Sequence, residues 1–289
     1  MPTDHKSVSS STFKFLPILW SLYQSIKNSI VQHFYKSLRF TFMNYFKISL
    51  FMTVSIFTGL AFADEPDFGK FDGTAVIIDL NTSKKLTYGK HADEQVSPCS
   101  TFKILNSIIA LENAVVKDEN EIIPWDGVVS EYPFWNHEHC MRSAIAVSTV
   151  WFYQELARRV GEAKMAKMVR AAKYGNMDTA KTLTSFWLGG GSLKISPNEQ
   201  ADFLSKLVRN QLPFSSRALT ITKDIMNLEK NKDYSLSGKT GSCDSIGWFV
   251  GFIEEGNVTK VFAFSLRGEG ANGVEAKNIA LRFLQKNAK

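Results

Sequence analysis

The segment Ser97–Lys103, with the sequence Ser-Pro-Cys-Ser-Thr-Phe-Lys, places a hydroxyl and an amine three residues apart. It precedes an apolar run at 104–116 that is typical of a buried helix. Residues three apart share a helix face, so Ser100 and Lys103 are expected to meet. A lysine whose pKa is lowered by apolar neighbours or a helix N-terminus can take the serine proton and create a nucleophile. A lone S-x-x-K occurs often by chance, so an ordinary helix start with a solvated lysine is the alternative.

The surrounding pattern indicates the elements that must hold this pair. Ser97 is predicted to cap the helix and Pro98 to occupy its first turn. Strands at both ends of the chain and a helical middle predict an α+β fold, with a sheet built from both termini, flanking helices and an inserted helical lobe. The expected strands are 74–80, 85–88, 234–241, 247–253 and 260–266, and the expected helical regions are 144–174, 198–208 and 275–285.

Length and charge set bounds on the function. The chain has 289 residues and 44% hydrophobic residues, which is enough for a sizeable core. Its net charge is +6, but residues 1–63 hold six Lys/Arg and one Asp, which leaves 28 basic and 27 acidic residues in the remainder. The basic balance therefore belongs to the N-terminal segment, and charge gives no support for nucleic-acid binding.

The N-terminal segment has the pattern of an export signal. A short basic start at 43–47 precedes an apolar core at 48–60 and the small residues of Ala61-Phe62-Ala63. We expect translation to begin at Met43 and cleavage to follow Ala63, which leaves a folded domain at 64–289. At about 13 residues the apolar core is short for a membrane span. An uncleaved N-terminal anchor is the alternative, and no stable membrane association is expected after cleavage.

Four further motifs follow Ser100-Thr101-Phe102-Lys103 in order. They are Ser148-Thr149-Val150, Tyr174-Gly175-Asn176, Phe186-Trp187-Leu188 and Lys239-Thr240-Gly241. Each motif is weak alone, but the order is specific. From about residue 70 to its end the chain therefore resembles the class D (OXA-type) serine β-lactamases, which share a fold with the penicillin-binding transpeptidases.

The resemblance implies a β-lactam hydrolase that confers resistance through an acyl-enzyme on Ser100. In this family the lysine, here Lys103, is carboxylated by CO2 to N6-carboxylysine and acts as the general base. Apolar walls from Val150 and Leu188 and an indole N–H from Trp187 would support the buried carbamate. A core Trp is the alternative for Trp187. No metal and no cofactor other than CO2 is expected.

The resemblance also implies the remaining parts of the cleft. Ser148 and Lys239 would form a proton relay beside the nucleophile. Backbone N–H groups of Ser100 and Ser242 would form an oxyanion hole, and Thr240 would bind the substrate carboxylate. Trp135 matches an aromatic residue that lines the cleft in the family, although simple surface packing is as plausible for it.

The chain departs from the family pattern at the carboxylate-binding arginine. Many class D enzymes carry an Arg at the start of the last helix, where this chain has Lys277. Lysine supplies charge without the bidentate geometry of Arg. Arg267, at the end of the preceding strand, could substitute, and the sequence leaves both residues open.

The three cysteines are the second departure from the family pattern. Some class A carbapenem-hydrolysing enzymes have a disulfide at positions equivalent to Cys99 and Cys243, so we expect this pair to be bridged after export to the oxidising periplasm. Two buried free thiols are the alternative. Cys140 is left over and is expected to be a buried free thiol.

Competing interpretations remain. His137-Glu138-His139 resembles a metal-binding fragment, but its spacing is not H-E-x-x-H and no third ligand is evident, so no metal site is expected. A β-lactam sensor or a penicillin-binding protein would share the motifs and be acylated without efficient turnover. Sensors of that type carry a large membrane protease domain upstream, whereas here a leader precedes the fold, which favours the hydrolase. The expected partners are small-molecule β-lactam antibiotics.

Overall fold

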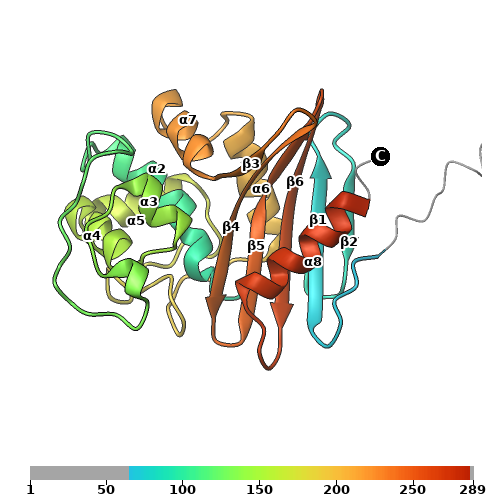
Figure 1. Ribbon diagram of the computed structural model, residues 1–289, viewed down its shortest axis with the longest axis horizontal. Helices are drawn as coiled ribbons and strands as arrows, with labels where there is room; N and C mark the ends of the chain where they lie inside the picture. Colours follow the sequence, from blue (N-terminus) through green and yellow to red (C-terminus); the bar gives the residue numbers. More distant parts are fainter. Residues whose placement is uncertain (1–64, 287–289) are drawn as a thin grey trace, which may run out of the picture. The chain divides into compact units, whose positions relative to one another are not determined.

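The computed structural model describes residues 65–286, which lie in a compact unit spanning Asp64–Lys289. A six-stranded antiparallel sheet forms its centre, with strand order β2-β1-β6-β5-β4-β3 (Figure 1). The N-terminal hairpin pairs with the C-terminal strands, from Asp72 opposite Arg267 to Asp79 opposite Lys260. The predicted sheet from both termini is therefore confirmed. The strands are β1 (Asp72–Asp79), β2 (Lys85–Tyr88), β3 (Asn227–Lys230), β4 (Tyr234–Cys243), β5 (Ile246–Glu255) and β6 (Val258–Arg267).

The two faces of the sheet are covered by different helices. The last helix, α8 (Gly273–Lys286), covers one face, and the opposite face is covered by α6 (Pro197–Val208) (Figure 1). Side chains alternate between faces along a strand. Phe262 and Phe264 of β6 accordingly belong to the apolar cluster that contains the α8 residues, whereas Val261 and Ala263 belong to the larger core shared with the helical lobe.

The helical lobe lies beside the β4 side of the sheet (Figure 1). The lobe comprises η1 (Cys99–Phe102), α2 (Lys103–Glu112), η2 (Pro133–Trp135), α3 (Met141–Ala146), α4 (Val150–Val160), α5 (Glu162–Ala171) and α7 (Ser216–Ile225). The central helix of the lobe, α2, is buried along its length except at Glu112, because the helices α4, α5 and α7 pack around it.

The start of the nucleophile helix differs from the prediction. Pro98 is the residue that precedes the first turn, and no side chain caps that turn. The assignment of Ser97 as the helix cap was wrong, because its hydroxyl accepts a hydrogen bond from Lys194 Nζ at 2.7 Å instead. The first turn is a 3₁₀ turn that continues into α2, and α2 ends at Glu112 rather than at 116.

The middle of the chain is more divided than its helical pattern indicates. The predicted helical region 144–174 consists of three helices, separated at Ser148 and at Gly161, both of which have positive φ. Positive φ interrupts a right-handed helix, and glycine adopts it without strain. The helix α7 and the short strand β3 were not predicted.

The predicted leader, its start at Met43 and its cleavage after Ala63 lie outside the described residues. Within 65–286, no helix has the length and apolar character needed to cross a membrane.

Candidate active site

Ser100 and Lys103 meet where the 3₁₀ turn η1 joins α2. Lys103 Nζ and Ser100 Oγ are hydrogen-bonded at 2.8 Å. The lysine side chain is fully buried, which excludes the solvated alternative. Burial holds the pKa of Lys103 well below its usual value, and the nearby charge of Lys239 lowers it further. A neutral amine in this position can accept the serine proton.

Aromatic residues lie close to the lysine in space or next to it in sequence. Phe102 stacks on Trp187 with ring centroids 5.2 Å apart, and Lys103 Nζ lies 5.5 Å from the centroid of the Tyr153 ring. Trp187 is fully buried, yet its Nε1–H has no hydrogen-bond partner among the described residues. An unsatisfied buried donor costs about 1–3 kcal/mol, so this N–H indicates an acceptor that completes the pocket. A carbamate on Lys103 has the oxygen atoms to be that acceptor.

The two predicted apolar wall residues are less enclosed than the lysine. Val150 begins α4, directly after the buried Thr149, and Leu188 directly follows Trp187. Both Val150 and Leu188 are half-buried. Leu188 packs against the large core cluster from its edge, so it lies between that core and solvent.

The strand β4 approaches the nucleophile turn closely. A Cβ atom at Gly241 would lie 3.0 Å from the Pro98 carbonyl oxygen, so a larger residue here would push the strand away. The predicted disulfide between Cys99 and Cys243 is present and joins the same two segments, with Cα atoms 5.8 Å apart. Cys140 is the free thiol within 65–286, and it is half-buried rather than buried as predicted.

One edge of β4 is free where it passes the nucleophile. The neighbouring strand β3 pairs with β4 only as far as Ser237. The backbone of Thr240 and Ser242 beyond that point pairs with β5 on the other side alone. Backbone N–H groups on an unpaired strand edge can bind a substrate oxygen. The exposed Ser242 hydroxyl accepts a hydrogen bond from Gly273 N at 2.8 Å, which fastens the start of α8 to this strand.

Lys239 is the second buried lysine of the site, with 5% of its surface exposed. Its Nζ donates to the Thr240 carbonyl oxygen at 3.0 Å and to Thr240 Oγ1 at 3.3 Å. Burial, and then the charge of Lys277, lower the pKa of Lys239 to about 7. The half-buried Ser148 lies between α3 and α4 with φ 62°, a backbone conformation that is uncommon outside glycine and clusters at functional sites.

The structure separates the two candidates for carboxylate binding. Arg267 forms an ion pair with the Glu94 carboxylate and donates to the Glu94 carbonyl oxygen at 3.4 Å. Lys277 is half-buried on α8, and its charge acts on Lys239. Of the two side chains, Lys277 is therefore the one that is electrostatically linked to the site.

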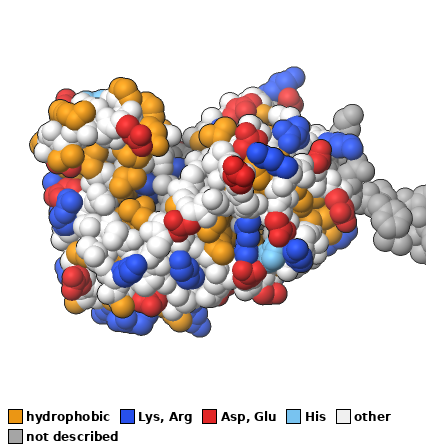
Figure 2. Space-filling view, turned by 90° about the horizontal axis from the view of Figure 1, so that it is seen from below, with side chains coloured by type: hydrophobic (Ala, Val, Ile, Leu, Met, Phe, Trp, Pro, Cys, Tyr) orange, Lys and Arg blue, Asp and Glu red, His pale blue; other side chains and the backbone are white. Residues whose placement is uncertain are grey.

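Trp135 is held at the wall of the lobe. Its Nε1 donates to the Val147 carbonyl oxygen at 2.9 Å, one residue before Ser148. Its own carbonyl oxygen accepts from Trp151 Nε1 at 2.7 Å. Figure 2 shows hydrophobic side chains gathered on the lobe. The rings of Tyr132 and Phe134 contact that of Trp135. The exposed large hydrophobic residues of this part of the chain are Val128, Val129, Tyr132, Phe134 and Val147.

Several supporting residues were missed by sequence reasoning because no motif marks them. Tyr153 donates or accepts a hydrogen bond with Ser107 Oγ at 2.9 Å beneath the lysine. Gln200 Nε2 donates to Thr101 Oγ1 at 2.7 Å. Trp248 Nε1 donates to the Ser97 carbonyl oxygen at 2.9 Å and so joins β5 to the segment before the nucleophile. Among these residues, Trp248 alone could have been singled out from the sequence, because it lies in the strand that follows Lys239-Thr240-Gly241.

The His137-Glu138-His139 fragment has a structural role. His139 is buried, and its ring is hydrogen-bonded to Ser143 Oγ at 2.9 Å and to the Phe134 carbonyl oxygen at 3.1 Å. Burial lowers the pKa of His139. Across residues 65–286, no group of three or more His, Cys, Asp or Glu side chains could hold a metal ion.

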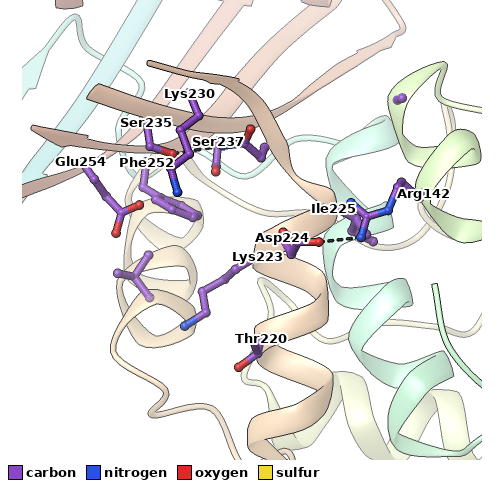
Figure 3. Close-up of a pocket in the computed structure, with 13 residues that line it drawn as sticks. Arg142, Thr220, Lys223, Asp224, Ile225, Lys230, Ser235, Ser237, Phe252 and Glu254 are labelled. Carbon is purple, nitrogen blue, oxygen red and sulfur yellow. Dashed lines mark hydrogen bonds and ion pairs between the residues drawn. The ribbon is translucent and has the colours of Figure 1, made fainter. Parts of the chain in front are cut away.

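A cavity lies apart from the predicted site residues. It has a volume of about 570 Å³ and lies where α7 meets the ends of β3, β4 and β5 (Figure 3). None of the predicted site residues lines it. Its charged groups are of both signs, and Arg142 and Asp224 pair with each other at 2.5 Å. The cavity therefore does not belong to the candidate site.

Comparisons with known proteins agree with this geometry. The penicillin-binding protein transpeptidase domain family matches residues 73–285. β-Lactamase OXA-48 of Klebsiella pneumoniae is 39% identical over 225 residues, which cover 76% of this chain and 84% of that protein. The crystal structure of a class D β-lactamase from Bacillus subtilis is similar with a TM-score of 0.74 and 38% identity, over 77% of this chain and 95% of that chain.

A regulatory protein is also among the relatives. BlaR1 of Bacillus licheniformis is 34% identical over 228 residues, but these residues make up only 38% of that protein and 76% of this chain. The match to OXA-48 covers most of both proteins, and the similar solved structure is titled a class D β-lactamase. From the hydrogen bond between Ser100 and the buried Lys103, the free edge of β4 and these relatives together, we conclude that the chain belongs to the class D serine β-lactamases.

Proposed function

We propose that this β-lactamase opens the lactam ring through an acyl-enzyme on Ser100, with a carboxylated Lys103 as its general base. The observation that carries the proposal is the fully buried Lys103 amine, 2.8 Å from the Ser100 hydroxyl. The indole of Trp187, stacked on the adjacent Phe102, has an N–H without an acceptor among the described residues. Only an uncharged amine combines with CO2, and burial lowers the pKa of Lys103 and so favours its uncharged form. The carbamate would supply an anionic oxygen base.

The residues around the lysine would hold that base in place. Trp187 would donate its Nε1–H to it, which satisfies the buried donor. Phe102 fixes the indole by stacking on it. Val150 and Leu188 would limit the access of water to the pocket, and no other cofactor is required.

The proposed reaction has two halves. Ser100 Oγ loses its proton to the base and attacks the lactam carbonyl carbon; the C–N bond breaks, and the ring nitrogen receives a proton through Ser148 and Lys239. Water, activated by the same base, then attacks the ester carbon and releases Ser100. Backbone N–H groups of Ser100 and Ser242 would stabilise the negative oxygen in both halves. Thr240 and Lys277 would bind the substrate carboxylate.

Turnover of a chromogenic cephalosporin with and without bicarbonate tests this proposal. We expect sustained hydrolysis, stimulation by bicarbonate, and no turnover in Ser100→Ala, because the nucleophile is absent. A single stoichiometric burst from the wild-type protein would instead indicate a sensor or a penicillin-binding protein, the alternative that the similarity to BlaR1 raises.

The low pKa of Lys239 predicts a pH dependence. The folded chain releases this proton near pH 7, whereas the unfolded chain keeps it to about 10.4. The charged form, which attracts a carboxylate and supplies a proton, therefore prevails only below about pH 7, so kcat/KM for an anionic substrate is expected to fall as the pH rises above 7. Stability changes in the opposite direction. Between pH 7 and about 10 the unfolded state binds one proton more than the folded state at this lysine, so the free energy of unfolding rises with pH.

Two matched variants test whether Lys239 causes this fall of kcat/KM above pH 7. Lys277→Met removes the neighbouring like charge, so the break in the kcat/KM profile should move to higher pH while KM increases. Arg267→Met should leave the break in place, because Arg267 is paired with Glu94. A break that is unchanged in Lys277→Met would contradict the proposed coupling.

The cellular setting is also part of the proposal. We propose that the domain 64–289 acts in the periplasm after export and cleavage of the leader. A disulfide beside the nucleophile suits an oxidising compartment. The proposed partners are small β-lactam molecules. Nucleic acid is not proposed, because the charge outside 1–63 is nearly balanced.

A further inference from the structure

The loop that follows Trp187 is fastened to the turn between β4 and β5. Asp244 Oδ2 accepts a hydrogen bond from Gly190 N at 2.7 Å. The carboxylate also lies over Gly189, where an added Cβ would come within 2.5 Å of Asp244 Oδ1. Lys181 Nζ donates to the Gly190 carbonyl oxygen from the other side. The loop is therefore held by the side chain of Asp244, 54 residues after Gly190, and by that of Lys181, nine residues before it.

The backbone around Asp244 is arranged for this contact. Asp244 and Ser245 have φ values of 48° and 56°, in the left-handed region that Asp tolerates better than most residues. Two such residues in succession form the tight turn after β4. Asp244 directly follows Cys243, which is bonded to Cys99 next to the nucleophile.

These contacts form a continuous connection around one side of the lysine pocket, which we call the belt. The belt consists of the Cys99–Cys243 disulfide, the Asp244–Gly190 hydrogen bond and the Trp187–Phe102 stack. Chain segments of one or a few residues join these three links. Leu188, which is half-buried, lies in the belt between the indole and Gly190.

We propose that Asp244 is a positioning residue that closes the 188–190 loop over the Lys103 pocket and thereby sets the affinity of this lysine for CO2. This inference depends on the proposed carboxylation of Lys103. Asp244 touches neither the substrate nor the lysine, and it acts through Gly190 and the segment that carries Trp187.

The physical reason is hydration of the pocket. Water that enters a buried site stabilises the charged form of an amine. A loop released from Asp244 would let water pass Leu188, so less of the amine would be neutral and able to take up CO2. It would also let the Trp187 indole move away from the position in which its N–H can bind the carbamate on Lys103. Both effects weaken carboxylation while the fold remains intact.

Three variants isolate the contact. Asp244→Gly removes the acceptor, and glycine accepts the left-handed backbone without strain. Asp244→Asn keeps an oxygen that can accept the Gly190 N–H and tolerates the same backbone, so it should restore wild-type behaviour. Gly189→Ala places a methyl group against Asp244 and should displace the carboxylate. In combination with Asp244→Gly, the alanine should have little additional effect.

Two readouts do not depend on turnover. Hydrogen–deuterium exchange of a peptide covering 186–191 is expected to be faster in Asp244→Gly than in wild type, since the Gly190 N–H loses its acceptor. With ¹³C-labelled bicarbonate, the NMR signal of the lysine carbamate should require about tenfold more bicarbonate in Asp244→Gly, the size expected when a hydrogen bond to a charged group is lost. The bicarbonate needed for half-maximal kcat should rise by the same factor.

The outcomes are distinguishable. Asp118→Ala is the matched control, because its carboxylate also accepts a backbone N–H, from Asn120 at 2.8 Å, in an exposed turn; it should leave all readouts unchanged. Unchanged exchange at 186–191, or faster exchange with an unchanged bicarbonate requirement, overturns the proposal. A wild-type protein without a carbamate signal refutes the proposed carboxylation itself, and this inference with it.

Discussion

Replacing Lys103 with methionine is expected to lower kcat for a chromogenic cephalosporin by about a thousandfold, within the range for loss of a general base. The lysine is fully buried and is hydrogen-bonded to the nucleophile at 2.8 Å. Methionine has a similar length and fills the pocket, but it can neither accept the serine proton nor combine with CO2. The remaining acylation should be slow, and the ester that forms should persist because no group activates the water.

Stopped-flow absorbance and intact-protein mass spectrometry separate the two halves of this effect. After prolonged incubation with a penicillin, Lys103→Met should retain the mass of one bound substrate, whereas Ser100→Ala should show no added mass. Lys206→Met, on an exposed position of α6, is the control for a lost lysine. Rapid recovery of the unmodified mass in Lys103→Met would exclude Lys103 as the base for deacylation.

The same substitution should not destabilise the fold. A fully buried amine is costly whether it keeps its proton or loses it, because desolvation opposes the charged form and the unfolded chain holds the proton more tightly. We therefore expect the thermal midpoint of Lys103→Met to equal or exceed that of the wild type. Lower activity with undiminished stability is the pattern of a residue retained for chemistry rather than for packing.

Loss of the Cys99–Cys243 disulfide is expected to reduce the free energy of unfolding by about 3–5 kcal/mol. The bridge spans 144 residues of sequence, so it strongly restricts the unfolded chain. In the folded state it joins the nucleophile turn to the end of β4. Urea denaturation of Cys99→Ala/Cys243→Ala, compared with the wild type, measures the effect.

Reduction provides a check without mutation. Dithiothreitol should lower the urea midpoint of the wild type towards that of the double variant, and it should leave the double variant unchanged. Cys140→Ser serves as the control, because that thiol is free and half-buried. If the reduced wild type kept its original midpoint, the bridge would be irrelevant to stability.

The sequence by itself determined the features that depend on local spacing. Ser100 and Lys103 are three residues apart, and any helical turn brings such residues together. The hairpin at the start of the sheet and the three closing strands followed from their alternating patterns and tight turns. Local geometry is sufficient for these features because neighbouring residues in the chain have few ways to be arranged.

Only the tertiary structure decided the features that depend on distant segments. The low pKa of Lys103 requires its burial in the folded protein, and the different surroundings of Lys277 and Arg267 follow from the ion pair of Arg267 with Glu94. The helix α7, the positive φ of Ser148 and the contact of Asp244 with Gly190 leave no periodic pattern in the sequence. Desolvation and pairing are properties of the environment that the whole fold creates, so no single stretch of residues encodes them.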